Sequence, residues 1–193
     1  TKWMGFIDLD EFVVPCIHNS IYDFLKRFNR KASAVLIYWK VFGTAGNLKL
    51  NKDKFVIEQL TMSFPKLNNI GKCFLNTDFQ YAKGNPKNLF MHHLLWCEWN
   101  GHLLPPVNIQ NRIAFSSFHT LKSDNISIQI NHYVTKSYED YYYKTNIKSD
   151  VYFKNNPRSI DKLWDIDYKC TEADFKIFKY LSKLKVMSQQ SIY

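Results

Sequence analysis

Residues 3–12 read WMGFIDLDEF, an apolar run that ends in a group of acidic side chains. Short apolar runs bounded by polar residues are typical of buried strands in a mixed or parallel sheet. Residues two apart in an extended chain point the same way, so we expect Asp8 and Asp10 to project together, roughly 7 Å apart at the backbone. Carboxylate oxygens suit Mg²⁺ or Mn²⁺. The segment predicts either a metal site at a strand end or a solvated turn with two surface acids.

A second group of polar residues follows the clearest strand of the sequence. Residues 126–133 alternate between apolar and polar side chains, which indicates a strand with one buried face. His132 stands near the end of this run, and Lys136 follows four residues later. A histidine at a strand end can bind a metal, and a lysine in the next turn can bind a phosphate as a point charge. The alternative for either residue alone is a solvated surface side chain.

Other segments predict a mixture of helices and strands. Ser20 is expected to cap a helix over 20–29, and Thr171 with Asp174 is expected to form the capping box of a helix over 171–185. A tyrosine-rich helix is expected to end near Asn146. Further expectations are strands over 34–39, 72–75 and 89–95, a turn at Asn100-Gly101, and either a strand or a helix within 53–64.

Length and composition are those of one globular domain. The chain has 193 residues, of which 46% are hydrophobic and 22% charged, enough for one sizeable core. No apolar run approaches the ~20 residues that span a bilayer. Helices that intervene between strands predict a single α/β unit over residues 1–193, built around a mixed sheet.

The charge of the chain bounds its partners. The formal net charge of +9 favours polyanions, acidic membrane surfaces or anionic small molecules such as diphosphates. The lysines are scattered and no nucleic-acid module is recognisable, so nucleic acid is not expected as a partner. Peripheral association with a membrane stays open. The four cysteines are too far apart in sequence for a zinc knuckle or redox pair. This favours a reducing, cytoplasmic location, with the Golgi lumen of a eukaryote as the alternative.

Four segments, in the same order, resemble glycosyltransferase family 92 and its bacterial relatives in the family-2-like group. Residues 3–12 resemble the family pattern W-x-x-x-x-D-x-D-E-F, and WKVFGTAG at 39–46 is similar to W-x-x-F-G-x-x-G. The triplet VIE at 56–58 and the run NHYVTKS at 131–137, followed by Lys144, resemble the later family segments. Order and spacing agree from residue 3 to about residue 148.

The resemblance implies a GT-A fold, which is a Rossmann-like mixed sheet with flanking helices and a D-x-D metal site. Such enzymes transfer a sugar from a nucleotide-diphosphate donor to a carbohydrate acceptor, usually with Mn²⁺ or Mg²⁺. By motif position, Asp10 would bind the metal, Asp8 would contact the metal or the donor ribose, and His132 would be the third protein ligand. Lys136 would steady the diphosphate.

The resemblance also suggests residues for the acceptor side. Glu58 is the candidate general base of an inverting reaction, with an exposed structural acid as the alternative. Glu11 is a weaker candidate that would support the metal site indirectly. Trp39 and Phe42 are candidates for stacking on the acceptor sugar, with burial in the core as the alternative for each.

The chain departs from the family pattern at its start. GT-A enzymes usually place a nucleotide-binding portion before the D-x-D strand, whereas here the motif occupies residues 8–10. We therefore expect the chain to lack that portion and to be the C-terminal, metal- and acceptor-binding part of the enzyme, with a helix and tail over about 170–193. This puts activity of the isolated chain in question. The rival interpretations are a non-catalytic carbohydrate-binding module, which would dispense with the metal, and a metal-dependent hydrolase.

Overall fold

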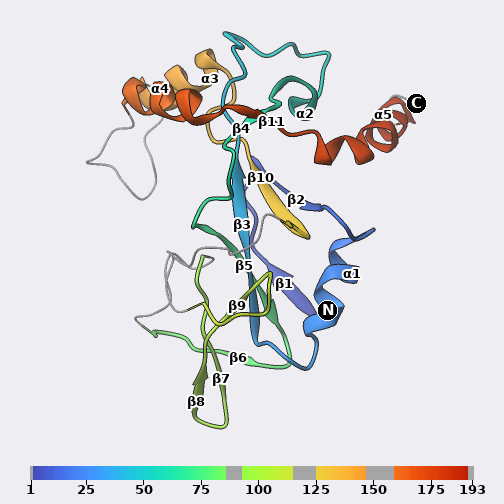
Figure 1. The fold of residues 1–193 in the computed structure, drawn as a ribbon, viewed down its shortest axis with the longest axis vertical. Coiled ribbons are helices and arrows are strands. Elements are labelled where there is room, and N and C mark those ends of the chain that lie inside the picture. Colours follow the sequence, from blue (N-terminus) through green and yellow to red (C-terminus); the bar gives the residue numbers. More distant parts are fainter. Residues whose placement is uncertain (1, 86–92, 115–124, 147–158, 191–193) are drawn as a thin grey trace. The chain divides into compact units, whose positions relative to one another are not determined.

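The computed structural model describes residues 2–85, 93–114, 125–146 and 159–190 (Figure 1). Its contacts divide into two compact units. The first comprises residues 1–40 and 66–132, and the second comprises residues 41–65 and 133–193. The single domain over 1–193 stays a prediction. Among the described helices, none combines the length and the apolar character needed to span a membrane.

The first unit is built around a mixed sheet with the strand order β1-β5-β3-β10-β2 (Figure 1). Antiparallel pairs join β1 to β5, β5 to β3, and β10 to β2, whereas a short strand, β9, runs parallel to β3. This arrangement confirms the predicted α/β fold with a mixed sheet. The strands are β1 (Trp3–Gly5), β2 (Glu11–Pro15), β3 (Ala34–Val41), β5 (Gly71–Asn76), β9 (Val107–Asn108) and β10 (Ile128–His132).

Strand β3 is buried on both faces, which explains its continuous apolar sequence. Val35 and Ile37 belong to one core cluster, and Leu36 and Tyr38 belong to another, as the alternation of side chains along a strand requires. The first cluster includes Phe24, Leu25 and Phe28 of helix α1 (Ile21–Leu25) and the 3₁₀ turn η1 (Lys26–Phe28). These elements therefore cover one face of the sheet.

Helix α1 begins where the sequence predicts. The Ser20 hydroxyl accepts a hydrogen bond from the Asp23 backbone N–H at 3.0 Å, which satisfies one of the free donors of the first turn. The α-helix ends at Leu25 and continues as η1 to Phe28, so it is shorter than the predicted 20–29.

A small separate sheet contains the predicted hairpin turn. It consists of β6 (Gln80–Tyr81), β7 (Cys97–Trp99) and β8 (His102–Leu104). Asn100 and Gly101 join β7 to β8 with φ angles of 49° and 77°, the two positive values that tight hairpin turns favour. Of the strand predicted over 89–95, residues 89–92 lie outside the described residues, and 93–95 contain only an isolated β-bridge at Leu94.

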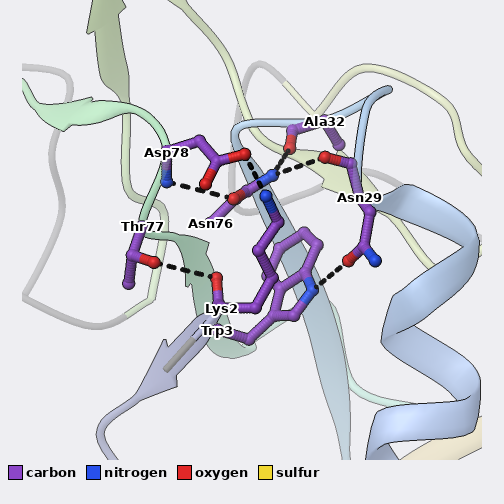
Figure 2. Close-up of polar contacts among 7 residues, drawn as sticks. All are labelled: Lys2, Trp3, Asn29, Ala32, Asn76, Thr77 and Asp78. Carbon is purple, nitrogen blue, oxygen red and sulfur yellow. Dashed lines mark hydrogen bonds and ion pairs between the residues drawn. The ribbon is translucent and has the colours of Figure 1, made fainter.

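Side-chain hydrogen bonds fix β1 along the edge of the main sheet (Figure 2). The Trp3 indole N–H donates to the Asn29 side chain at 2.8 Å, and the Asn76 amide donates to the Asn29 carbonyl at 3.1 Å. Lys2 forms an ion pair with Asp78, just beyond β5. These contacts join β1 to the segment after α1 and to the end of β5, so the chain leaves β1 from a fixed position.

The second unit contains most of the described helices. The undecided segment 53–64 forms α2 and β4, and the predicted tyrosine-rich helix is confirmed as α3. The elements are α2 (Val56–Gln59), β4 (Met62–Ser63), α3 (Tyr138–Asn146), α4 (Ile160–Lys169), β11 (Glu172–Ala173), the 3₁₀ helix η2 (Lys176–Tyr180) and α5 (Leu181–Gln190).

The helix predicted over 171–185 is wrong in its first half. Glu172 and Ala173 pair with β4, and the Asp174 backbone N–H donates to the Thr61 carbonyl at 2.9 Å. The Asp174 carboxylate accepts from the N–H of Lys176, the first residue of the later 3₁₀ helix, at 3.0 Å. Pairing with a strand distant in sequence outweighs the local capping pattern, and the α-helix begins only at α5. Helix α4 was not predicted.

Candidate functional site

Asp8 to Glu11 form a tight turn between β1 and β2, not the extended strand end expected from the sequence. The Glu11 N–H donates to the Asp8 carbonyl at 3.0 Å, and the Glu11 carboxylate accepts from the Asp8 N–H at 3.1 Å. Leu9, inside the turn, is fully exposed. Because these reciprocal bonds fold the chain back within four residues, the two-residue alternation of a strand does not apply. The prediction that Asp8 and Asp10 project from one strand face is wrong.

The turn instead places Asp10 beside His132. The Asp10 Oδ1 and His132 Nε2 atoms lie 3.9 Å apart, and both side chains are largely buried. The pairing of β2 with β10 sets this approach, because Glu11 and His132 face each other in the register. One cation with ligand distances of about 2.0 to 2.2 Å could touch both atoms. The expected approach of these two residues is present, whereas their role as metal ligands stays a prediction.

The side chains around Asp10 can supply only part of the coordination shell of a metal ion. Within the described ranges, no group of three or more His, Cys, Asp or Glu side chains could hold a metal ion. Mg²⁺ often binds through one or two carboxylates, with phosphates and water completing the shell, and imidazole shifts the preference toward transition metals such as Mn²⁺. One carboxylate and one imidazole therefore fit an ion that shares its remaining positions with a diphosphate.

Lys72 places a positive charge beside the acidic turn. Its side chain lies on the buried strand β5 and is 1% exposed. The Nζ atom is 2.7 Å from the Asp8 carboxylate and 3.5 Å from the Glu11 carboxylate. Asp8, the other predicted metal residue, thus forms an ion pair with Lys72 in this structure.

Glu11 is an acid of the candidate site with a strongly raised pKa. Its side chain is fully buried, and this burial raises its pKa to about 7, against the opposing effects of the Asp8 N–H and the Lys72 charge. A carboxyl group in this range exchanges its proton near neutral pH. The turn therefore contains an acid that can be charged or neutral under ordinary conditions.

Trp39 packs against two of these side chains. Its ring centroid lies 4.5 Å from that of His132, and the Lys72 Nζ lies 5.8 Å from the Trp39 centroid. The indole therefore restricts the His132 imidazole and makes a cation–π contact with the buried ammonium group. Trp39 is only partly buried, and its predicted stacking on an acceptor sugar stays a prediction.

The remaining predicted residues lie in the second unit. Phe42 is fully buried and packs against Tyr133, with 4.7 Å between ring centroids, so its surroundings favour the core role over sugar stacking. Lys136 is partly buried and has a φ of 55°, an uncommon value for a residue with a side chain. Ser137, which follows it, caps α3 by accepting from the Asp140 N–H at 3.2 Å. The diphosphate role of Lys136 stays a prediction.

Glu58 has a structural role of its own in the second unit. Its carboxylate accepts from the Phe55 N–H at 3.0 Å at the start of α2 and lies 2.6 Å from the Lys185 ammonium of α5. The hydrogen bond from Lys185, followed by the bond from Phe55, lowers the Glu58 pKa. Its assignment as the general base stays a prediction.

The sequence interpretation omitted Lys72 and gave Glu11 little weight. The signal for Lys72 was a charged residue inside the apolar run GKCFLN at 71–76. A lysine at the centre of a fully buried strand needs an opposite charge nearby, because an unpaired buried charge is costly. The acidic segment at 8–11 was the candidate partner, although nothing in the sequence alone paired the two.

Comparison with known proteins bears on the N-terminal part of the chain. Residues 1–80 match the family model described as glycosyltransferase family 92. The matched segment includes the acidic turn, Trp39 and Lys72, whereas His132 follows it. No curated protein and no solved structure matches the chain. The match supports the family resemblance over residues 1–80, which contain three of the four motifs, whereas the run at 131–137 lies outside it.

Proposed function

We propose that this chain, whose residues 1–80 match the model of glycosyltransferase family 92, transfers a sugar from a nucleotide-diphosphate donor to a carbohydrate acceptor with the help of Mn²⁺ or Mg²⁺. The family match supports glycosyl transfer in general. The distance of 3.9 Å between Asp10 and His132 is the observation that carries the metal-dependent form of the proposal. These two residues come from segments far apart in sequence, and the fold brings an oxygen and a nitrogen donor together.

In this proposal, the residues of the site have separate roles. The Asp10 carboxylate and the His132 imidazole would hold the metal, which when bound neutralises negative charge on the leaving diphosphate. Trp39 limits the rotation of the imidazole and so keeps its nitrogen directed at the site. Lys136 would add a second positive charge for the diphosphate, and inversion of the anomeric centre is the proposed stereochemical course.

The acceptor hydroxyl must lose a proton during transfer. In the proposal, the Glu58 carboxylate takes it, which requires hydrogen-bonding reach of that hydroxyl. The ion pair with Lys185 makes Glu58 a weaker base than a free glutamate, because the paired carboxylate is stabilised in its charged form. Glu58 must therefore leave Lys185, at least in part, before it can accept the proton.

The first test is binding of Mn²⁺ to the metal-free protein, measured from the loss of the free-ion signal in electron paramagnetic resonance. Asp10→Asn and His132→Ala should each weaken Mn²⁺ binding by at least about tenfold, which corresponds to about 1.4 kcal/mol. His102→Ala is the matched control, because His102 is exposed on the hairpin strand β8. Mn²⁺ affinities that are equal in all four proteins would refute the metal site.

Transfer itself is tested with a panel of nucleotide-sugar donors. The expected result is metal-dependent release of the nucleoside diphosphate and formation of a glycoside with a carbohydrate acceptor. Asp10→Asn and His132→Ala should lose this activity, and His102→Ala should retain it. Binding of glycans without metal and without turnover would instead support a carbohydrate-binding module.

A further inference from the structure

We infer that Lys72 is a positioning residue that holds the Asp8–Glu11 turn in the conformation that presents Asp10 to His132. This inference rests on the proposed function where it is tested by Mn²⁺ binding, but not where it is tested by the hydrogen exchange of the turn. It starts from the burial of the lysine. Lys72 is 1% exposed and lies on β5, which β1 and β3 flank on either side. Its backbone is therefore anchored in the sheet, and its side chain reaches the turn from a fixed origin.

The ammonium group contacts both ends of the turn. Its Nζ lies 2.7 Å from the carboxylate of Asp8, the first residue of the turn, and 3.5 Å from the carboxylate of Glu11, the last. The two ends are also joined directly by the two Asp8–Glu11 hydrogen bonds. Asp10 lies between these ends, so its placement follows from theirs.

Charge balance explains why a lysine suits this position. A buried ammonium group needs opposite charge or hydrogen-bond acceptors, and Asp8 and Glu11 supply both. Trp39 adds its ring, 5.8 Å from the Nζ, and also packs against His132. Lys72 is thus linked to Asp10 through the turn and to His132 through the indole. Asp10 and His132, the two residues proposed to hold the metal, thus both depend on one side chain that does not itself bind the ion.

The test compares Lys72→Met with the wild type in Mn²⁺ binding. Methionine fills a similar volume without charge. Loss of a positive charge near a cation site should by itself tighten Mn²⁺ binding, so a weaker affinity separates positioning from simple electrostatics. We expect Lys72→Met to weaken Mn²⁺ binding by at least about tenfold, and Lys72→Arg to recover part of that loss. Lys169→Met is the matched control, since Lys169 also forms a 2.7 Å ion pair with an aspartate, but on the exposed surface of α4.

A second readout does not require any metal. Amide hydrogen exchange should become faster at Asp8 and Glu11 in Lys72→Met than in the wild type, and remain unchanged at the residues of α1. If Lys72→Met does not fold, the double variant Lys72→Met/Glu11→Gln removes both opposed buried charges and is compared with Glu11→Gln alone. A Mn²⁺ affinity that is unchanged or tighter on loss of Lys72, with unchanged exchange at the turn, overturns the inference. Faster exchange in a protein that binds no Mn²⁺ supports the positioning role and refutes the proposed metal site.

Discussion

At the scale of single residues, the two candidate glutamates occupy opposite environments. Burial raises the pKa of Glu11 to about 7, whereas Lys185 lowers that of Glu58. General base catalysis is most effective when the pKa lies near the working pH. Glu11 therefore has the more suitable pKa but sits inside the turn, and Glu58 has the motif position but a stabilised charge. Sequence indicated both residues, but it contained neither the burial that raises the Glu11 pKa nor the contact with Lys185 that lowers the Glu58 pKa.

The role of Glu58 is tested by Glu58→Gln. If Glu58 is the base, turnover at saturating donor should fall by about 10² to 10⁴, because glutamine keeps the shape but cannot take the proton. Mn²⁺ and donor binding should survive. Glu139→Gln is the control, since Glu139 also pairs with a lysine, Lys49 at 3.1 Å, but on the exposed surface. Retention of more than about a third of the turnover would exclude Glu58 as the base.

At the scale of elements, local patterns succeeded where no distant partner competed. Ser20 caps α1 as predicted, and Asn100-Gly101 turns the β7–β8 hairpin. Thr171 and Asp174 carried an equally good capping pattern, yet the adjacent residues form β11 because β4 is available for pairing. The acidic segment was likewise predicted as a continuation of the preceding strand, whereas the hydrogen bonds between Asp8 and Glu11 bend it into a turn. Capping and alternation are local signals. Neither identifies the distant residues whose contacts decide between helix, strand and turn.

The start of β5 supplies a pH prediction. The Gly71 N–H donates to the His93 Nδ1 atom at 3.0 Å, and the His93 carbonyl lies 3.1 Å from the Cys73 thiol. Burial, aided by the charge of Lys72, holds the His93 pKa below its usual 6.5. Because the His93 pKa is lower in the folded state, the unfolded chain binds more protons once the pH falls through 6.5, the ordinary pKa of histidine. His93 therefore makes the free energy of unfolding decrease as the pH drops below 6.5.

His93→Asn should therefore reduce the acid sensitivity of the protein. Asparagine keeps a hydrogen-bonding group for Gly71 but does not titrate. We expect the loss of unfolding free energy between pH 7.5 and pH 5 to be smaller in His93→Asn than in the wild type, as measured by urea unfolding at both pH values. His102→Asn, at an exposed histidine, should behave like the wild type. An identical pH dependence in all three proteins would show that His93 does not titrate in this way.

At the scale of the molecule, the fold class followed from the sequence more readily than the division into units. Strands interspersed with helices predicted an α/β fold, and the mixed sheet confirms it. The division into two units was not predicted, because residues 41–65 join the second unit through contacts with segments beyond residue 133. One such contact runs from the Thr44 N–H to the Asp167 carboxylate at 2.7 Å. Such pairings across more than a hundred positions leave no periodic trace in the sequence.

The net charge of +9 makes a prediction about the proposed anionic donor. A basic protein raises the local concentration of a diphosphate, and salt weakens this effect, since the screening length falls from about 10 Å at ~0.1 M salt to about 3 Å at ~1 M. The Michaelis constant for the nucleotide-sugar donor should rise several-fold over this range, whereas that for an uncharged glycoside acceptor should change much less. Circular dichroism at both salt concentrations checks that the protein stays folded. If donor and acceptor constants rise together, salt acts on the protein as a whole, and the basic charge does not serve donor capture.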